Sequence, residues 1–310
     1  MGKITKASML FCATAVFAAA SPASAVPGGP PIAYAVNSGS MIDVYLSNAD
    51  GSGKVKVYST TAKHSLWQID MRAGGNQLAL VENVSPPSIF GTIKIISYSD
   101  AGAVSNITSV APDNVCRVLG IDYHPTDGSI LVGRACNQGT VLEVRRLVNA
   151  VYDSSPIITL NNPGGNMAAG YIRWLGDGSG FLWAVGDASN GGRIERHMLS
   201  NPYAPVTVYQ TGDFSLPNWL DVARCTGTLD SSCSKILVTT RAGQLQLVTF
   251  DDFGGSQPVN LFTTNSVDGH YSPDNSHILW RYQTHSGYQL MIDNSIFLSK
   301  GGTGVKDWRQ

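Results

Sequence analysis

The sequence has little charge of either sign. Charged residues make up 14% of its 310 residues and the formal net charge is −1, whereas an average soluble protein carries about 25% charged residues. A chain so close to neutrality does not attract nucleic acid or an anionic bilayer through bulk charge. We therefore expect neither of these among its partners.

Familiar catalytic motifs are also missing. The sequence has no Gly-x-Ser-x-Gly elbow, no His-Glu-x-x-His metal site and no phosphate-binding loop. Each of these motifs fixes a nucleophile, a zinc ion or a phosphate by its spacing, so the enzyme classes that depend on them are excluded. Beyond its first residues the chain has no apolar run long enough to cross a bilayer, and we expect no transmembrane segment.

The first residues differ from the rest of the chain. Lys3 and Lys6 precede an apolar run over residues 9–20, which is too short to span a bilayer, and small residues follow it up to Ala25. This order is typical of a secretory signal peptide. We predict that residues 1–25 are removed by cleavage after Ala25, and that residues 26–310 form one domain in the periplasm or outside the cell.

What the sequence does contain is a repeat. A turn of the Asp-Gly type is followed at once by an apolar strand, and these strands begin 42 to 55 residues apart, near Ile32, Leu78, Ile130, Phe181, Ile236 and Ile278. Repeats of about 40 to 50 residues are typical of β-propeller blades. We predict an all-β, six-bladed β-propeller with four antiparallel strands in each blade. Five or seven blades are the alternatives if a terminal repeat is misassigned.

The two ends of the chain complement each other. The first repeat opens on Ile32–Val36, which corresponds to the second strand of the other repeats, and it lacks a first strand. Residues Val305–Trp308 look like such a first strand without a turn after it. Pairing these two segments would close the ring and remove its open sheet edges.

Four cysteines remain after the signal peptide, and the repeats suggest how they pair. Cys116 lies just before one predicted strand and Cys136 just after the next, so the hairpin between them places the two opposite each other. Cys225 and Cys233 bracket the corresponding turn of a later repeat. We predict the disulfides Cys116–Cys136 and Cys225–Cys233, which an exported protein can keep. Four buried free thiols are the alternative.

Three segments carry a family resemblance: Ile32–Val36, Ile42–Gly53 and Tyr271–Asn275. They resemble the repeats of TolB-type β-propellers, in which a strand ends in Trp-Ser-Pro-Asp-Gly and a later strand reads Asp-Ile-Tyr before an Asp-Gly turn. The resemblance covers the propeller part of that family only. It implies an exported, non-catalytic module for protein binding or scaffolding. The partner would be another exported or envelope protein, and we expect the chain itself to be a monomer.

Aligning the repeats places one polar residue per blade on the predicted innermost strands. This row consists of Asp70, Asp122, Arg173, Asp221, His270 and Asp307. The next residue in each strand is apolar or aromatic, and alternation sends the two sets to opposite sides of the sheet. We favour a structural role, in which each aspartate bonds backbone amides of the neighbouring blade. The alternative is a channel site for a divalent cation or a small polar ligand, as in a metal-dependent hydrolase or lactonase; we expect no other cofactor.

Loops at the entrance to the innermost strands form a second candidate surface. Its candidate interface residues are His64, Trp67, Phe90, Phe214, Trp219 and His285. Aromatic side chains on such a rim can anchor a partner. The alternative is that they pack between the blades.

Overall fold

The computed structural model describes residues 32–308 apart from 62, 84–90, 111–114, 212–215, 218, 224, 226–233, 241, 252–253, 263–264, 285–286 and 299–301, and of 302–305 and 308 the backbone alone. The predicted signal peptide lies outside these residues. The described chain forms β-strands and two short 3-10 turns, η1 (Asn137–Gly139) and η2 (Pro163–Gly165). In this part of the chain no helix is long and apolar enough for a membrane span.

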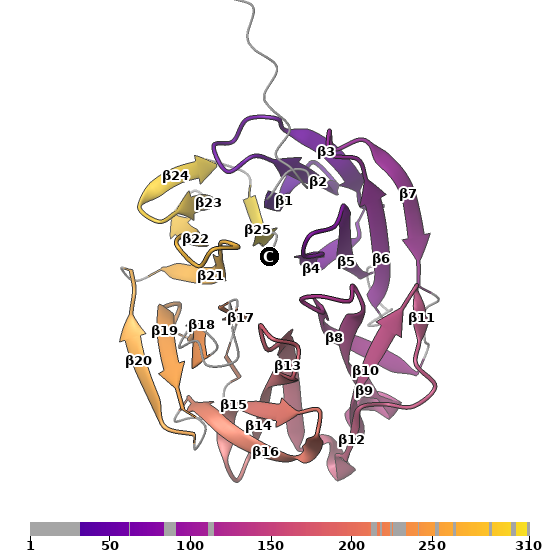
Figure 1. Cartoon of the computed structure of the whole chain (residues 1–310), viewed down its shortest axis with the longest axis vertical. Helices are drawn as coiled ribbons and strands as arrows, with labels where there is room; N and C mark the ends of the chain where they lie inside the picture. The colour runs from indigo at the N-terminus through magenta and orange to yellow at the C-terminus, as the bar shows by residue number, and fades with distance from the viewer. Residues whose placement is uncertain are drawn as a thin grey trace, which may run out of the picture.

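Six antiparallel sheets surround a central axis (Figure 1). Blade 1 contains β25 (Gly302–Trp308), β1 (Ile32–Ser38), β2 (Met41–Ser47) and β3 (Val55–Ser59). Blade 2 contains β4 (Ser65–Met71), β5 (Gln77–Asn83), β6 (Gly91–Tyr98) and β7 (Val104–Ser109). Blade 3 contains β8 (Cys116–Tyr123), β9 (Ile130–Cys136), β10 (Val141–Val148) and β12 (Ile158–Asn161), with the short β11 (Val151–Tyr152) also paired to β10.

The other three blades repeat this plan. Blade 4 contains β13 (Met167–Trp174), β14 (Gly180–Asp187), β15 (Gly191–Met198) and β16 (Asn201–Gln210). Blade 5 contains β17 (Trp219–Val222), β18 (Lys235–Thr239), β19 (Leu245–Phe250) and β20 (Ser256–Asn260). Blade 6 contains β21 (Ser266–Tyr271), β22 (Ile278–Thr284), β23 (Gly287–Ile292) and β24 (Ser295–Leu298). The predicted six-bladed propeller is therefore confirmed.

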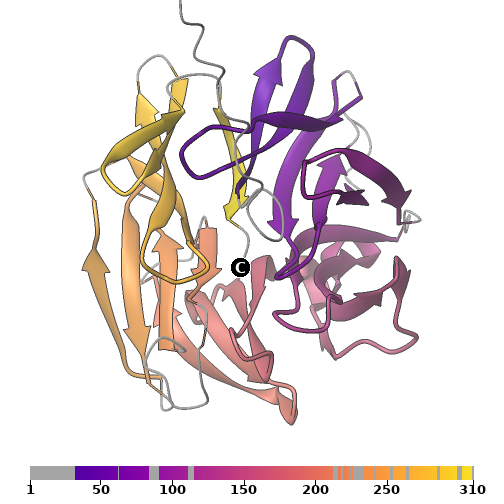
Figure 2. The same ribbon diagram turned by 45° about the horizontal axis from the view of Figure 1, so that its top comes forward.

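The ring is closed by the two ends of the described chain. β25 lies beside β1 as the innermost strand of blade 1 (Figures 1 and 2), and Ala33 is paired with Asp307 and Tyr34 with Lys306. The predicted closure is confirmed. It also places Lys306 and Asp307 at the axis, where they meet residues from the other end of the sequence.

Burial follows the position of a strand in its blade. In β14, the second strand of blade 4, every residue except Asp187 is buried. In β20, the outermost strand of blade 5, every residue is exposed. A strand packed on both faces favours a continuous apolar run. A polar outermost strand discourages edge-to-edge pairing with other molecules.

The hydrophobic core is divided among the interfaces between blades. Val44 and Leu46 of blade 1 pack with Ile69 and Leu78 of blade 2, and all four are fully buried. Burying one such side chain contributes roughly 1.5 to 3 kcal/mol. Because each blade supplies residues to its neighbours, the blades stabilise one another around the ring.

The recurring turn has a local cause. In blade 3, Asp127 Oδ1 accepts a hydrogen bond from the amide of Ser129 at 2.8 Å, and Gly128 between them has φ +72°. In blade 4, Asp177 bonds the amide of Ser179 in the same way. An aspartate followed by a residue that accepts the left-handed conformation therefore defines the turn in each case.

The innermost strands carry β-bulges near their entrance ends. The register with the second strand shifts between Leu66 and Gln68 in β4 and between Val118 and Gly120 in β8. Comparable shifts occur in β13 and β21. A bulge turns side chains out of strict alternation, so several side chains at this end of the ring point where a simple two-residue period would not place them.

The Cys116–Cys136 disulfide is confirmed, with one correction to its setting. The sequence analysis placed the two cysteines just outside their strands, whereas they lie inside β8 and β9 as a directly paired cross-strand position. Cys225 is also disulfide-bonded, and its predicted partner Cys233 lies outside the described residues.

Candidate functional site

The polar row lies around the central axis, near the carboxyl ends of the innermost strands. All six of its members are buried: Asp70, Asp122, Arg173, Asp221, His270 and Asp307. Asp122 is the most exposed of them, at 7%. Ionisable groups so far from water must be paired or hydrogen-bonded, so their partners decide what the channel can do.

One carboxylate oxygen of each aspartate in the row accepts a hydrogen bond from a backbone amide of the next blade. The four hydrogen bonds run from Met71 N to Asp307 Oδ2 (2.6 Å), Tyr123 N to Asp70 Oδ2 (2.5 Å), Trp174 N to Asp122 Oδ2 (2.5 Å) and Tyr271 N to Asp221 Oδ2 (2.9 Å). The bonds join blades 1 and 2, 2 and 3, 3 and 4, and 5 and 6. This geometry is the one that the structural interpretation of the row requires.

The second oxygens of three aspartates face Arg173. Its Nη1 lies 3.0 Å from Asp122 Oδ1 and 3.6 Å from Asp70 Oδ1, and its Nε lies 3.5 Å from Asp221 Oδ1. Burial alone would lower the pKa of Arg173, but the surrounding carboxylates outweigh it and the pKa is raised. A guanidinium thus occupies the place among the carboxylates that a bound cation would need.

His270 supplies the partner of the remaining oxygen. Its Nδ1 lies 3.0 Å from Asp307 Oδ1. Burial, followed by the charges of Lys306 and Arg173, holds the pKa of His270 well below its usual range. At neutral pH the imidazole is therefore uncharged, and it lies against Asp307 without supplying a balancing charge.

Burial also raises the pKa of every carboxyl in the row. The pKa of Asp221 is raised to about 6, and those of Asp70, Asp122 and Asp307 are raised by the same desolvation, with like charges adding to the effect at Asp122 and Asp307. Asp221 therefore takes up a proton under mildly acidic conditions.

An aromatic chain crosses the channel toward its entrance. The rings of Trp67 and Tyr171 are stacked with centroids 6.0 Å apart, Tyr171 and Trp219 follow at 4.7 Å, and Trp219 and His270 at 4.8 Å. These four residues come from β4, β13, β17 and β21. The chain connects an exposed tryptophan with the buried polar row.

A second charged group, which the sequence analysis missed, lies beside this chain. Lys306 is fully buried, with its Nζ donating to the backbone oxygen of Asp268 and lying 5.8 Å from the centre of the Trp219 ring. Asp268 pairs with Arg281 at 2.6 Å. Burial lowers the pKa of Lys306 to about 7. The only available signal was a lysine inside the closing strand, next to Asp307.

The predicted rim residues separate into three groups. Trp67 is 39% exposed, and His64 is partly buried with its Nδ1 2.8 Å from Glu82. Trp219 begins β17 at the entrance end but is 3% exposed, and its Nε1 donates to the backbone oxygen of Gly269. Phe90, Phe214 and His285 lie outside the described residues.

Potential metal ligands do not converge in the row. Among the described residues, the group of three or more ligand atoms within 4.8 Å of one another consists of Cys116, Cys136 and Glu143. Its two sulfurs form the disulfide and are not thiolates, which are the metal-binding form of cysteine. In the channel, the carboxylate oxygens are divided between amides, Arg173 and His270.

Fold and channel together define a six-bladed β-propeller closed by its terminal strands. No family model and no curated protein matches the sequence. Among solved structures, the chain is similar to TolB from Acinetobacter baumannii, with a TM-score of 0.63 and 16% identity over 91% of this chain and 67% of that one.

Two further solved structures share the fold. One is a chain of a nidogen/laminin complex, with a TM-score of 0.61, 10% identity and coverage of 90% of this chain and 98% of that one. The other is a putative 6-phosphogluconolactonase from Bacteroides uniformis, with a TM-score of 0.51, 15% identity and coverage of 90% and 83%. At these identities the likenesses show a TolB-like propeller fold and nothing finer.

Proposed function

We propose that this chain is an exported, non-catalytic propeller that binds another protein at the entrance end of its ring. The observation that carries the proposal is Trp67. Its side chain is exposed, yet it is held by stacking on Tyr171 and by a hydrogen bond from its Nε1 to the backbone oxygen of Leu119 at 3.3 Å. Rigid surface tryptophans are among the most frequent anchors of protein interfaces.

The contents of the channel support binding at the surface. Tyr171 and Trp219 connect Trp67 with His270 across the ring, and Arg173 lies among the carboxylates beyond them. A ligand that had to enter the ring would displace these packed side chains. A protein partner can instead contact the exposed edge of Trp67 without entering.

The metal-dependent hydrolase or lactonase receives less support. A divalent cation in the row would compete with the guanidinium of Arg173 and would remove carboxylates from the amides that join the blades. Among the similar structures, the putative lactonase favours this alternative, whereas the nidogen/laminin complex is an assembly of proteins. Both likenesses are at the level of the fold.

Export is the second part of the proposal. The apolar N-terminal run and the small residues before position 26 favour removal of a signal peptide. The Cys116–Cys136 disulfide fits an oxidising compartment, since cytosolic proteins rarely keep such bonds. We place the protein in the periplasm or outside the cell.

Site-specific photocrosslinking in the exporting cell tests the proposal. A benzophenone amino acid replaces Trp67 in one variant and Val259 in a control, because Val259 is 56% exposed on the outermost strand of blade 5. We expect one reproducible protein to be captured from position 67 and not from position 259. A purified Trp67→Ala protein should then bind that partner about 30-fold more weakly, since an anchor residue contributes about 2 kcal/mol.

Three results would overturn the proposal. One is the same set of crosslinked proteins from positions 67 and 259. Another is reproducible failure to capture any protein from position 67. The third is equal affinity of the Trp67→Ala and unaltered proteins for the captured partner.

A further inference from the structure

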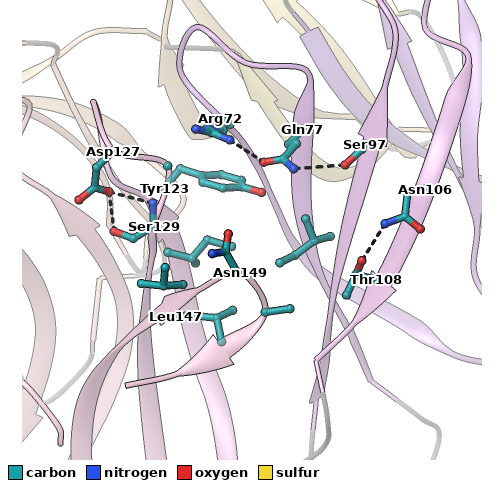
Figure 3. A pocket seen from close by; sticks show the side chains of 15 residues that line it. Arg72, Gln77, Ser97, Asn106, Thr108, Tyr123, Asp127, Ser129, Leu147 and Asn149 are labelled. Atoms are coloured by element: carbon teal, nitrogen blue, oxygen red, sulfur yellow. Dashed lines mark hydrogen bonds between the residues drawn. The ribbon is translucent and has the colours of Figure 1, made fainter. Parts of the chain in front are cut away.

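A cavity of about 320 Å³ lies between blades 2 and 3, near the ends of β4 and β8 and away from the entrance. Its volume is within the range of small-molecule sites. Blade 2 supplies residues from β5, β6 and β7, and blade 3 supplies the turn after β8 and the turn after β10 (Figure 3). The cavity is separate from the central row and the aromatic chain.

Neutral amides and hydroxyls dominate the polar lining of this cavity. Gln77 Nε2 donates to Ser97 Oγ at 3.2 Å, and Asn106 Nδ2 donates to Thr108 Oγ1 at 3.0 Å. Each pair is thereby oriented before a ligand arrives, and Figure 3 shows the two pairs on neighbouring strands. Groups that both donate and accept suit a ligand whose own groups do the same.

The charged residues of the lining are already engaged. Arg72 Nη1 donates to Gln77 Oε1 at 2.9 Å, and its guanidinium packs so closely on Gly128 that a Cβ there would lie 2.4 Å from it. Asp127 pairs with Arg146 and accepts hydrogen bonds from Ser129. Asp127 is thus neutralised by Arg146, and Arg72 is the one charged group of the lining that bonds a neutral amide instead. Most of the remaining polar lining is uncharged.

Tyr123 supplies a further polar group to the lining of the cavity. It is 5% exposed, and in the part of the chain that is described its hydroxyl has no hydrogen-bond partner. Burial raises the pKa of this hydroxyl, so it stays protonated and able to donate. Figure 3 shows the ring extending across the cavity with the exposed Asn149 beside it.

The lining also offers apolar surface beneath the polar groups. Ile95 of blade 2 and Ile130 and Leu147 of blade 3 line the cavity and belong to one hydrophobic cluster. Carbon-bound hydrogens of a sugar ring can pack on such side chains while its hydroxyls bond the amides. We propose that this cavity binds a neutral, polyhydroxylated ligand of the size of a mono- or disaccharide.

Saturation-transfer NMR with a panel of neutral mono- and disaccharides, together with sugar phosphates, tests the proposal. The key variant is Tyr123→Phe, and its matched control is Tyr271→Phe. Tyr271 holds the equivalent position in blade 6, and its buried hydroxyl also has no partner within the described residues. Both substitutions remove a hydroxyl that no protein group binds, so both proteins should fold as the unaltered one does.

We expect at least one neutral saccharide to bind the unaltered protein and Tyr271→Phe equally. Tyr123→Phe should weaken binding about tenfold, because one hydrogen bond is lost. Asn106→Ala, at an exposed lining position, should weaken it too, whereas Asn260→Ala on the outermost strand of blade 5 should not. Failure of the neutral panel at millimolar concentration, binding of sugar phosphates alone, or equal affinities for Tyr123→Phe and Tyr271→Phe would overturn the proposal.

Discussion

Arg173 contacts three of the four aspartates at the axis, and its single positive charge cannot balance all of them. The remaining stabilisation comes from backbone amides, which donate to one oxygen of each aspartate. Removing one partner of a buried ion pair is far more harmful than never having formed the pair, because a desolvated charge is left behind. The row should therefore respond strongly to single substitutions and to pH.

Replacement of Arg173 by methionine tests the balance of charge. We expect Arg173→Met to lower the free energy of unfolding by about 3 to 5 kcal/mol at pH 7.5, because the carboxylates lose their buried cation. Without that cation the folded-state pKa values of the carboxyls rise further above their unfolded values. Groups raised in this way contribute stability at low pH that is lost as pH rises. The deficit should therefore shrink at pH 5 in urea unfolding.

The control for this prediction is Arg117→Met, because Arg117 is exposed at the start of β8. Its effect should stay within about 0.5 kcal/mol at both pH values. A deficit of Arg173→Met that is equal at pH 7.5 and pH 5 would contradict the account of the row.

Asp221 gives a pH prediction with a defined window. Its folded-state pKa is raised to about 6, whereas an unfolded aspartate titrates near 3.8. Its favourable contribution is present below pH 3.8 and is lost as pH rises to about 6. The asparagine of Asp221→Asn can still accept a hydrogen bond from the amide of Tyr271, and it does not titrate. Relative to the unaltered protein, the variant should gain about 2 kcal/mol in unfolding free energy between pH 4 and pH 7.

Asp153→Asn serves as the comparison for Asp221→Asn, since Asp153 is exposed beside β11. Urea unfolding at pH 4, 5, 6 and 7 should give parallel curves for Asp153→Asn and the unaltered protein. Parallel curves for Asp221→Asn as well would refute the raised pKa.

Among the elements, the β8–β9 hairpin is reinforced twice. Asp127 fixes its turn, and the Cys116–Cys136 disulfide joins its open end with 20 residues of sequence separation. A cross-link over a loop of this length restricts the unfolded chain and contributes about 3 kcal/mol. The hairpin supplies Asp122 to the row and one wall of the cavity between blades 2 and 3.

The double substitution Cys116→Ser, Cys136→Ser should lower the unfolding free energy by about 3 kcal/mol. Thermal and urea unfolding of oxidised protein measure this loss. Peptide mapping after alkylation without reduction should leave both cysteines of the unaltered protein unlabelled. Labelling of either residue, or a double variant as stable as the unaltered protein, would contradict the prediction.

The closing strand β25 is an element on which the whole ring depends. It completes blade 1 beside β1, and it carries Lys306 and Asp307. Deletion of residues 302–310 should expose the edge of β1 and leave the amide of Met71 without its carboxylate. We expect the deleted chain to aggregate or to lose its cooperative thermal transition.

Two comparisons sharpen this prediction. Deletion of residues 309–310 alone spares β25 and should leave the melting temperature unchanged. Adding a synthetic peptide of residues 302–310 should restore part of the transition to the longer deletion. A 302–310 deletion that melts like the unaltered protein would show that the ring does not need its closing strand.

At the scale of the whole molecule, the six blades form a ring around one axis, and β25 completes the first blade (Figure 2). Asp307 from one end of the chain accepts the amide of Met71, 236 residues away in sequence. Ring closure therefore couples the stability of the two ends. A chain built in this way offers its end faces and the spaces between blades for binding, which is where the two proposed sites lie.

Export of the molecule is predicted to end with cleavage after Ala25. Expression of the full sequence in an exporting cell should yield protein that begins at Val26 in N-terminal sequencing. A variant with Ala23→Leu and Ala25→Leu should keep its N-terminal segment, because the cleavage site requires small residues. Recovery of uncleaved, unaltered protein in the cytoplasmic fraction would contradict the prediction.

The sequence by itself determined the features that depend on local chemistry. Apolar strands alternate with turns in which an aspartate bonds a nearby amide, and this repeat was enough to predict six blades, the closing strand and the Cys116–Cys136 pair. It also placed one polar residue of each blade on the innermost strand. These features follow from strand geometry and turn conformation, which extend over a few residues.

Only the tertiary structure decided what those residues meet. Packing around the axis buries Trp219, the first residue of β17, and Tyr171 from the bulged part of β13 joins it in the aromatic chain. Arg173 reaches aspartates of three other blades, and Lys306 finds Asp268 across blades 1 and 6. The repeat pattern of the sequence does not indicate the cavity between blades 2 and 3. Contacts of this kind depend on the curvature of the closed ring, which brings together residues that no local pattern connects.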